Sequence, residues 1–221
     1  MILCYPEIES VMDFSSSGIH SLVIENPTFF RSLLTDLYAQ KNGENGRFIL
    51  SDGEKELSMG AYVEVIDNRI NFDINTRPLL NKIIASLERV SMNESYFLET
   101  SELLQQVEQY VERLAFSFDC DIACDHCTVG GLLKGVGLCL SDEYDDPLER
   151  VIDYMELIRE FDRDKLFVFV NMRSFFEDDH IERFLKTVSD HGYNVLLMDS
   201  ICGPKYYLED RITIDKDLCE F

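Results

Sequence analysis

Short apolar runs bounded by polar or charged residues predict buried strands at both ends of the chain. Residues 21–24, 166–170 and 194–198 are such runs, and strands buried on both faces are typically near-continuous in hydrophobic character. Between the last two runs, residues 177–188 carry apolar positions at helical spacing, namely Ile181, Phe184, Leu185 and Val188. A helix between two apolar strands predicts a parallel βαβ unit.

The first strand leads directly into a predicted helix. Asn26 and Pro27 suit the N-cap and the first helical position, and apolar residues at helical spacing continue to about Tyr38. Residues 48–53 predict a strand followed by an Asp-Gly hairpin turn, and residues 61–66 predict another short strand. The N-terminal part of the chain therefore also has α/β character.

The middle of the chain is different, because two long helical patterns follow one another there. The first opens at Thr76 and Pro78 and the second is predicted to be capped by Thr100. Each has an apolar stripe, so we expect an antiparallel pair of amphipathic helices. The predicted organisation is an α/β domain formed by residues 1–68 and 137–221, with an α-helical domain, 69–136, inserted between them.

Charge narrows the possible functions. The 221 residues include 20 Lys and Arg against 42 Asp and Glu, a formal net charge of −22, which argues against a generally basic nucleic-acid binder or a binder of anionic membranes. A local basic patch and carboxylates neutralised by divalent cations both remain compatible with it. The longest apolar run, 166–170, is too short for a membrane span. With no signal peptide and an odd number of cysteines, seven, we expect a cytoplasmic protein without disulfides.

The motifs of nucleotide-binding and hydrolytic sites are absent from the sequence. No G-x-x-x-x-G-K-[ST] or G-x-G-x-x-G occurs, and the glycine-rich stretch 129–135 has the wrong spacing and no hydroxyl after its lysine. The loop after Ile24, Glu25-Asn26-Pro27, lacks the glycines of a phosphate cradle. None of the four histidines lies in a nucleophile motif. We therefore expect no bound nucleotide.

Two clusters in the middle of the chain suggest metal chemistry. Cys120, Cys124, Cys127 and His126 resemble part of a zinc site, but His126 and Cys127 are adjacent and no second ligand pair follows, so reduced, buried cysteines are the preferred interpretation. The carboxylates of Asp119, Asp121 and Asp125 lie within seven residues and suit Ca²⁺ or Mg²⁺. Metal binding and a solvated acidic surface both remain open for these carboxylates. The acidic runs at 142–146 and 177–179 are accounted for by helix N-termini.

Several segments, in this order along the chain, resemble one known family. They are residues 22–27 with Phe30-Arg31, 72–75, 132–134, 166–171, 195–198 and 214–218. Together they resemble the type II-A CRISPR-associated accessory protein of spacer acquisition. The resemblance implies an α/β head domain related to P-loop ATPase folds but without a Walker A loop, and an α-helical leg domain. It further implies a homotetrameric ring that binds Ca²⁺ and the ends of linear double-stranded DNA, working with the CRISPR integrase proteins and the RNA-guided nuclease.

The resemblance also implies roles for particular residues. In the family, acidic residues ahead of the Leu-Lys motif help to bind calcium; here Asp121 and Asp125 precede Leu133-Lys134, with Asp119 nearby, although cysteines and an alanine interrupt the run. Basic residues inside the ring contact DNA, and the candidates are Arg31, Lys134, Arg173, Lys205, Arg211 and Lys216. The alternative for each is a solvated side chain or an ion pair. The resemblance implies that the protein acts as a scaffold rather than as an enzyme.

Two other functions fit the same sequence. A metal-dependent nuclease or phosphohydrolase would use the carboxylates of residues 119–125. An acidic adaptor that binds proteins and no DNA would account for the net charge of −22. Cleavage of linear duplex DNA would indicate the nuclease or phosphohydrolase. Failure to retain DNA at low salt would indicate the adaptor.

Overall fold

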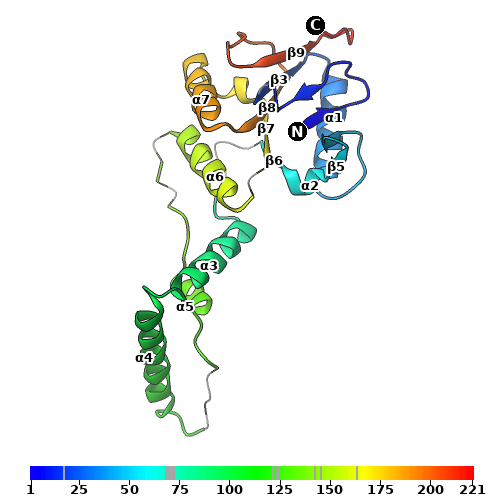
Figure 1. The fold of residues 1–221 in the computed structure, drawn as a ribbon. Coiled ribbons are helices and arrows are strands. Elements are labelled where there is room, and N and C mark those ends of the chain that lie inside the picture. The colour runs from blue at the N-terminus through cyan, green and yellow to red at the C-terminus, as the bar shows by residue number, and fades with distance from the viewer. Residues whose placement is uncertain are drawn as a thin grey trace. The chain divides into compact units, whose positions relative to one another are not determined.

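The computed structural model describes residues 1–16, 18–67, 73–120, 122, 125–141, 143–144, 146–162 and 164–221. It is a mixed α/β structure that divides into two compact units, Met1–Phe72 with Tyr144–Phe221, and Asp73–Glu143 (Figure 1). The sequence pattern predicts boundaries after residues 68 and 136, and in the structure the units divide after residues 72 and 143. We call the units the α/β unit and the helical unit.

A five-stranded parallel sheet is the centre of the α/β unit. Its strands, in order across the sheet, are β6 (Val63–Ile66), β7 (Leu166–Val170), β8 (Asn194–Asp199), β3 (Ile19–Ile24) and β9 (Asp210–Ile214). Every neighbouring pair is parallel. The pairing of β7 with β8 confirms the predicted βαβ unit, and all residues of β3 and β7 are buried, as their apolar runs indicated.

A second, antiparallel sheet has four strands in the order β2 (Met12–Asp13), β1 (Ile2–Cys4), β4 (Ile49–Asp52) and β5 (Lys55–Leu57). The predicted hairpin turn joins β4 to β5, with Gly53 at a φ of +58°, a conformation that favours glycine. A one-turn helix, α2 (Met59–Tyr62), leads from this sheet to β6. The strands β1 and β2 are too short for apolar alternation to predict them.

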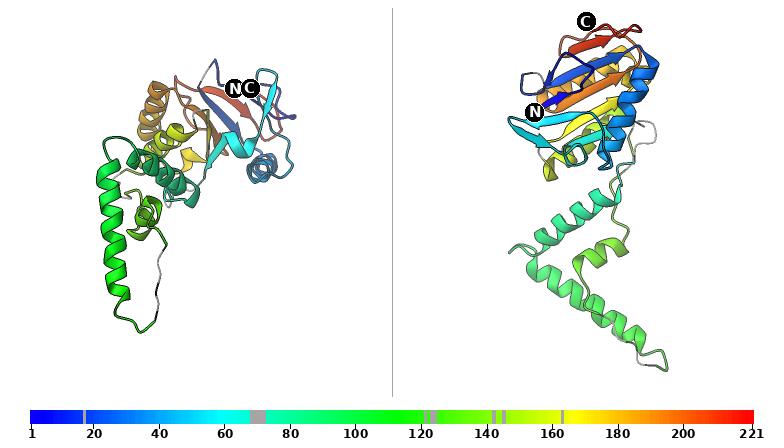
Figure 2. Two further views of the ribbon diagram at one scale, coloured as in Figure 1. Left: turned by 60° about the horizontal axis from the view of Figure 1, so that its bottom comes forward. Right: turned by 90° about the vertical axis from the view of Figure 1, so that its right-hand side faces the viewer.

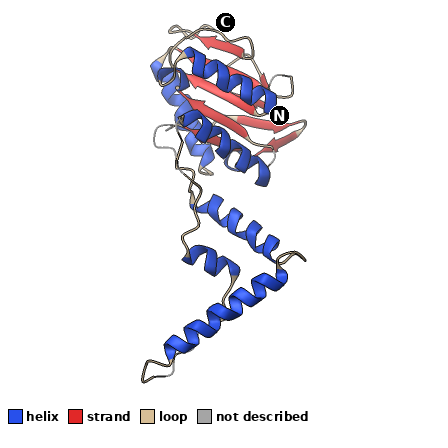
Figure 3. Cartoon of the chain, turned by 90° about the vertical axis from the view of Figure 1, so that its left-hand side faces the viewer, coloured by secondary structure: helices blue, strands red, loops and turns tan. Residues whose placement is uncertain are grey.

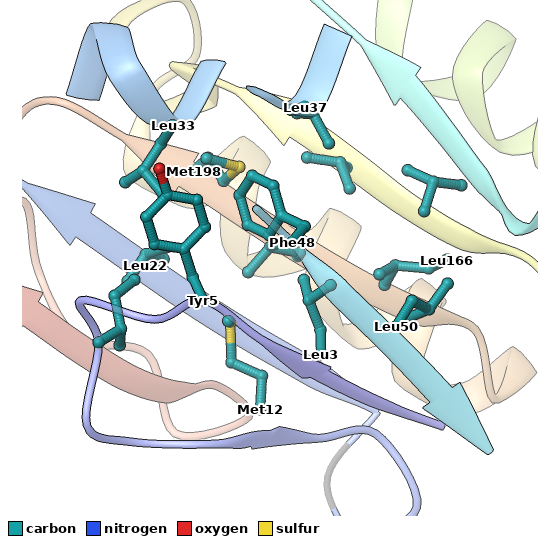
Figure 4. Close-up of a cluster of buried hydrophobic side chains, with 14 of the residues drawn as sticks. Leu3, Tyr5, Met12, Leu22, Leu33, Leu37, Phe48, Leu50, Leu166 and Met198 are labelled. Carbon is teal, nitrogen blue, oxygen red and sulfur yellow. The ribbon is translucent and has the colours of Figure 1, made fainter. Parts of the chain in front are cut away.

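The main hydrophobic core lies between the two sheets and helix α1 (Pro27–Lys41). Figure 4 shows Tyr5 and Phe48 in this core, with ring centroids 4.7 Å apart. Around them are Leu22, Leu166 and Met198 from the parallel sheet, Leu3, Met12 and Leu50 from the antiparallel sheet, and Leu33 and Leu37 from α1. The core therefore joins segments from both ends of the chain.

Helices α6 (Pro147–Phe161) and α7 (Asp178–His191) cover the other face of the parallel sheet, opposite α1 (Figure 2). Phe169 of β7 packs edge-on against Phe184 of α7, with ring centroids 5.1 Å apart. The residues of α7 that are buried are the four that the helical spacing predicted, Ile181, Phe184, Leu185 and Val188. Successive residues of β7 thus point into two different cores.

The helical unit contains α3 (Arg77–Ser91), α4 (Phe97–Ala115) and α5 (Val129–Gly135) (Figure 3). The predicted antiparallel packing of the two long helices is wrong, because α3 packs against α5 and no residue of α4 is buried. The predicted start of the second helix near Thr100 is also too late, since α4 begins at Phe97. An apolar stripe indicates that a helix has a partner, but does not identify it.

Contacts within the helical unit explain its boundaries. The side chain of Asn75 donates to the carbonyl of Leu140 at 3.2 Å and accepts from the Leu140 N–H at 2.7 Å. These bonds tie the returning segment to the start of α3, so the unit extends to Glu143 rather than ending at 136. Among the described residues, none of the helices is long and apolar enough to cross a membrane.

Candidate functional site

The carboxyl edge of the parallel sheet is the first place to look for a site. In open α/β sheets, ligands bind beyond the carboxyl ends of the strands, where the chain leaves toward opposite faces. Here β3 leads into α1 on one face, and β7 leads through a short 3₁₀ helix, η1 (Met172–Ser174), into α7 on the other. Two groups of polar side chains lie at this edge.

The first group surrounds the N-terminus of α1, the position of a phosphate loop in nucleotide-binding proteins. The side-chain oxygen of Asn26 accepts hydrogen bonds from the N–H groups of Thr28 and Phe29, at 3.1 and 3.0 Å. Pro27 has no N–H to donate, and the Asn26 amide donates to the carbonyl of Lys216 at 2.9 Å. The N–H groups that would meet a phosphate are therefore bonded within the protein.

The second group is a buried network of two arginines and two carboxylates. Arg173 of η1 donates from Nε to Asp199 at 3.1 Å, and its Nη2 pairs with Glu209. Arg211 of β9 pairs with the other oxygen of Glu209 at 2.5 Å. The side chains of all four residues are 8% exposed or less, so the two positive and two negative charges are matched inside the protein.

This network changes the set of predicted DNA contacts. Arg173 and Arg211 were predicted to face DNA, but their guanidinium groups bind Asp199 and Glu209 and are buried. We therefore exclude both arginines from a phosphate-binding surface. Sequence reasoning missed the two carboxylates, although an aspartate at the end of the apolar run 194–198 is a signal that could have identified Asp199.

The other four predicted DNA contacts are exposed. Arg31 lies on α1, and the bond from Asn26 places Lys216 beside the first turn of that helix. Lys205 lies in the loop formed by residues 200–209, which Arg173 and Arg211 contact. Lys134 lies on α5 of the helical unit, whereas the other three belong to the α/β unit.

The predicted calcium ligands follow helix α4. Asp119 and Asp125 are exposed, and Asp121 lies outside the described residues. Asp119 lines a pocket of about 760 Å³ at the end of α4, together with Glu112, Phe116 and Phe118. Within the described part of the chain, no three His, Cys, Asp or Glu side chains are gathered as a metal ion would need. The ligand set of Asp119, Asp121 and Asp125 thus remains a prediction.

The neighbouring cysteines were predicted to be buried, and the structure does not place Cys120 or Cys127 in a core. Cys120 is exposed and Cys127 is partly buried, while Cys124 lies outside the described residues. Glu108 of α4 accepts a hydrogen bond from the Cys127 N–H at 2.7 Å and lies 3.5 Å from Nδ1 of His126. These contacts bring the segment after α4 back against that helix.

Comparison with known proteins identifies the family. Residues 40–218 match the family described as CRISPR-associated protein (Cas_Csn2). The chain is also similar to the CRISPR-associated protein Csn2 of Enterococcus faecalis, with 22% identity over 180 residues, which is 80% of this chain and 81% of that protein. The chain therefore belongs to the Csn2 family, which takes part in the adaptation stage of type II-A CRISPR systems.

Proposed function

We propose that this protein is a non-enzymatic ring that binds the ends of linear double-stranded DNA during CRISPR spacer acquisition. The observation that carries the proposal is the family match over residues 40–218. In this role the protein works with the CRISPR integrase proteins and the RNA-guided nuclease. The bonded N–H groups at the start of α1 support a head domain of P-loop type that no longer binds nucleotide.

A homotetramer is proposed on the basis of the apolar surface of the helical unit. Amphipathic helices of soluble proteins normally bury their apolar stripe, yet α4 has 19 residues and buries none of them. The large side chains that it exposes are Phe97, Leu98, Leu103, Tyr110, Val111 and Leu114. Packing of this face against other copies of the chain would remove it from water.

DNA contact is proposed for the four exposed basic residues, Arg31, Lys134, Lys205 and Lys216. Phosphate binding depends on the local charge and on the counterions released, and not on the total charge of the protein. Repetition of these residues around a ring would concentrate positive charge on one surface. The carboxylates that make up the net charge of −22 would then repel DNA from the outer surface.

Calcium binding is proposed for Asp119, Asp121 and Asp125. Hard divalent cations prefer oxygen ligands and offset the repulsion between neighbouring carboxylates. The exposure of Asp119 and Asp125 leaves them accessible to an ion, and Asp119 shares its pocket with Glu112. When bound, the ion would supply positive charge that holds this acidic segment together.

The test is a mobility-shift assay at low salt with Ca²⁺, in which linear duplex is compared with the same DNA closed into a circle. A ring that is loaded at DNA ends retards linear DNA and leaves the circle unretarded. Divalent-dependent cleavage that is lost in Asp121→Ala would instead favour the metal-dependent nuclease. The absence of binding to either form would favour the acidic adaptor.

A further inference from the structure

The loop formed by residues 200–209, between β8 and β9, is held by hydrogen bonds from two arginine side chains. Arg173 donates from Nη1 to the carbonyl of Pro204 at 2.9 Å, and Arg211 donates from Nη1 to the carbonyl of Gly203 at 2.7 Å. Each arginine also binds a buried carboxylate. The backbone of the loop is therefore joined to the buried ion network.

Further contacts fix the second half of the loop. Glu209 accepts from the N–H of Tyr206 at 3.0 Å, and the Tyr206 hydroxyl donates to Asp178 of α7 at 2.9 Å. The guanidinium of Arg173 lies over the Tyr206 ring, 5.1 Å from its centroid. The loop and the first turn of α7 thus form one connected surface.

Burying four charged side chains is costly, because each loses its hydration. Apolar residues of similar size would often give equal or greater stability at such a site. The network instead fixes the conformation of a loop that contains no helix or strand. A surface that is fixed in this way loses little entropy when it binds a partner.

The loop exposes side chains of the kind that anchor protein interfaces. Tyr207 is fully exposed, and Ile201 is 58% exposed. Tyrosine is among the residues that contribute most to binding energy at protein interfaces, since it supplies a large contact area and loses few rotamers. The fixed loop therefore presents an aromatic anchor that is not used within the α/β unit.

The charge around the loop indicates the chemistry of the partner. Glu177, Asp178 and Asp179 are exposed at the start of α7. The exposed cations beside them are Lys205 of the loop and Arg183, whose Nε donates to the carbonyl of Asp179 at 3.3 Å, so the carboxylates outnumber the cations. This negative charge attracts a positively charged surface, and a DNA contact by Lys205 is the alternative use of the same loop.

We propose that the loop formed by residues 200–209, together with the first turn of α7, docks a positively charged face of a partner protein, with Tyr207 as its anchor. This inference rests on the proposed function, in which the chain works beside the integrase proteins and the RNA-guided nuclease. Proteins that handle nucleic acid carry such basic surfaces.

The test measures binding of the full chain to the purified integrase proteins and nuclease of the same CRISPR system, with lysozyme as an unrelated basic protein. Tyr207→Ser is expected to weaken binding to at least one of them by tenfold or more. The matched control is Val11→Ser, which alters an exposed apolar residue elsewhere in the α/β unit. The DNA mobility shift is measured in parallel on each variant.

A second variant tests the charge. Glu177→Gln combined with Asp179→Asn leaves the Tyr206–Asp178 bond in place and should weaken binding several-fold at low salt, with a smaller loss at high salt. Failure of the wild type to bind these proteins, equal binding of lysozyme, or an equal loss in Val11→Ser would overturn the inference. So would a Tyr207→Ser variant that loses DNA binding and keeps its protein partners. Failure of wild-type DNA binding alone would contradict the proposed function and leave the docking surface intact.

Discussion

Single charged residues in this protein owe their roles to the partners that the fold supplies. Arg173 and Arg31 cannot be distinguished by residue type, yet one is buried against Asp199 and Glu209 and the other is exposed. A residue of opposite charge that is distant in sequence decides between the two outcomes. The resemblance therefore allows basic residues to be proposed as DNA contacts. It does not show which of them are exposed and able to make such a contact.

Glu220 illustrates the same point near the C-terminus, and it predicts a pH effect. Partial burial raises its pKa, but hydrogen bonds from Ser10 and from the N–H of Glu9 outweigh this and hold the pKa below its usual value of 4.5. A carboxyl whose pKa is lowered on folding stabilises the protein above its unfolded pKa, and this stabilisation is lost as the pH falls through the folded value.

Glu220→Gln should therefore lower the free energy of unfolding by about 1 kcal/mol at pH 7. The difference from wild type should shrink as the pH falls below about 4.5, because the wild-type carboxyl then becomes protonated. Urea unfolding of both proteins at several pH values measures this difference in the free energy of unfolding. A deficit that is unchanged at low pH would show that charge at this position does not contribute.

At the scale of elements, periodicity predicted most helices and strands of the α/β unit but failed on packing in the helical unit. The stripe of α3 was expected to meet α4, and instead it meets α5. The N-terminus of α5 approaches α3 so closely that the Gly130 N–H donates to the Glu88 carboxylate at 3.0 Å. A contact of this kind depends on one glycine and one carboxylate, and has no repeating pattern.

Gly130→Ala should disrupt this packing. An added Cβ would lie 2.3 Å from the Glu88 carboxylate oxygen and 3.3 Å from Ile84, so the Glu88 side chain must move away and its hydrogen bond from the N–H of residue 130 is lost. We expect a loss of about 1 kcal/mol in the free energy of unfolding, with faster proteolysis between α4 and α5. Gly135→Ala is the matched control, since its Cβ would meet open space on the same helix. Equal stability of the two variants would refute the proposed contact.

At the scale of the whole molecule, the helical unit exposes a large amount of apolar surface. Leu98, Phe116 and Phe118 are 73%, 87% and 62% exposed, and Phe116 and Phe118 lie close to the predicted calcium ligands in sequence. The proposed ion site is thus close in sequence to one end of the proposed assembly face. Neighbouring carboxylates that lose their cation repel one another.

Removal of calcium should therefore weaken the proposed tetramer. Sedimentation velocity is expected to show a tetramer with Ca²⁺ and smaller species with EGTA, because an ion that binds only the assembled state stabilises it by mass action. Asp119→Asn combined with Asp125→Asn should make the sedimentation insensitive to EGTA, because the variant lacks the carboxylates that bind the ion. Identical sedimentation with and without EGTA would contradict a role for calcium in assembly.

The sequence by itself determined the strands at 21–24, 166–170 and 194–198 and the buried face of α7, because burial imposes a local repeat of apolar residues. The resemblance of ordered segments also led to the family. Tertiary structure alone decided that α3 packs on α5, that the short strand β1 pairs with both β2 and β4, and that Arg173 and Arg211 are neutralised at the sheet edge. Those outcomes depend on which distant residues meet, and a pairing between distant residues leaves no periodic trace along the chain.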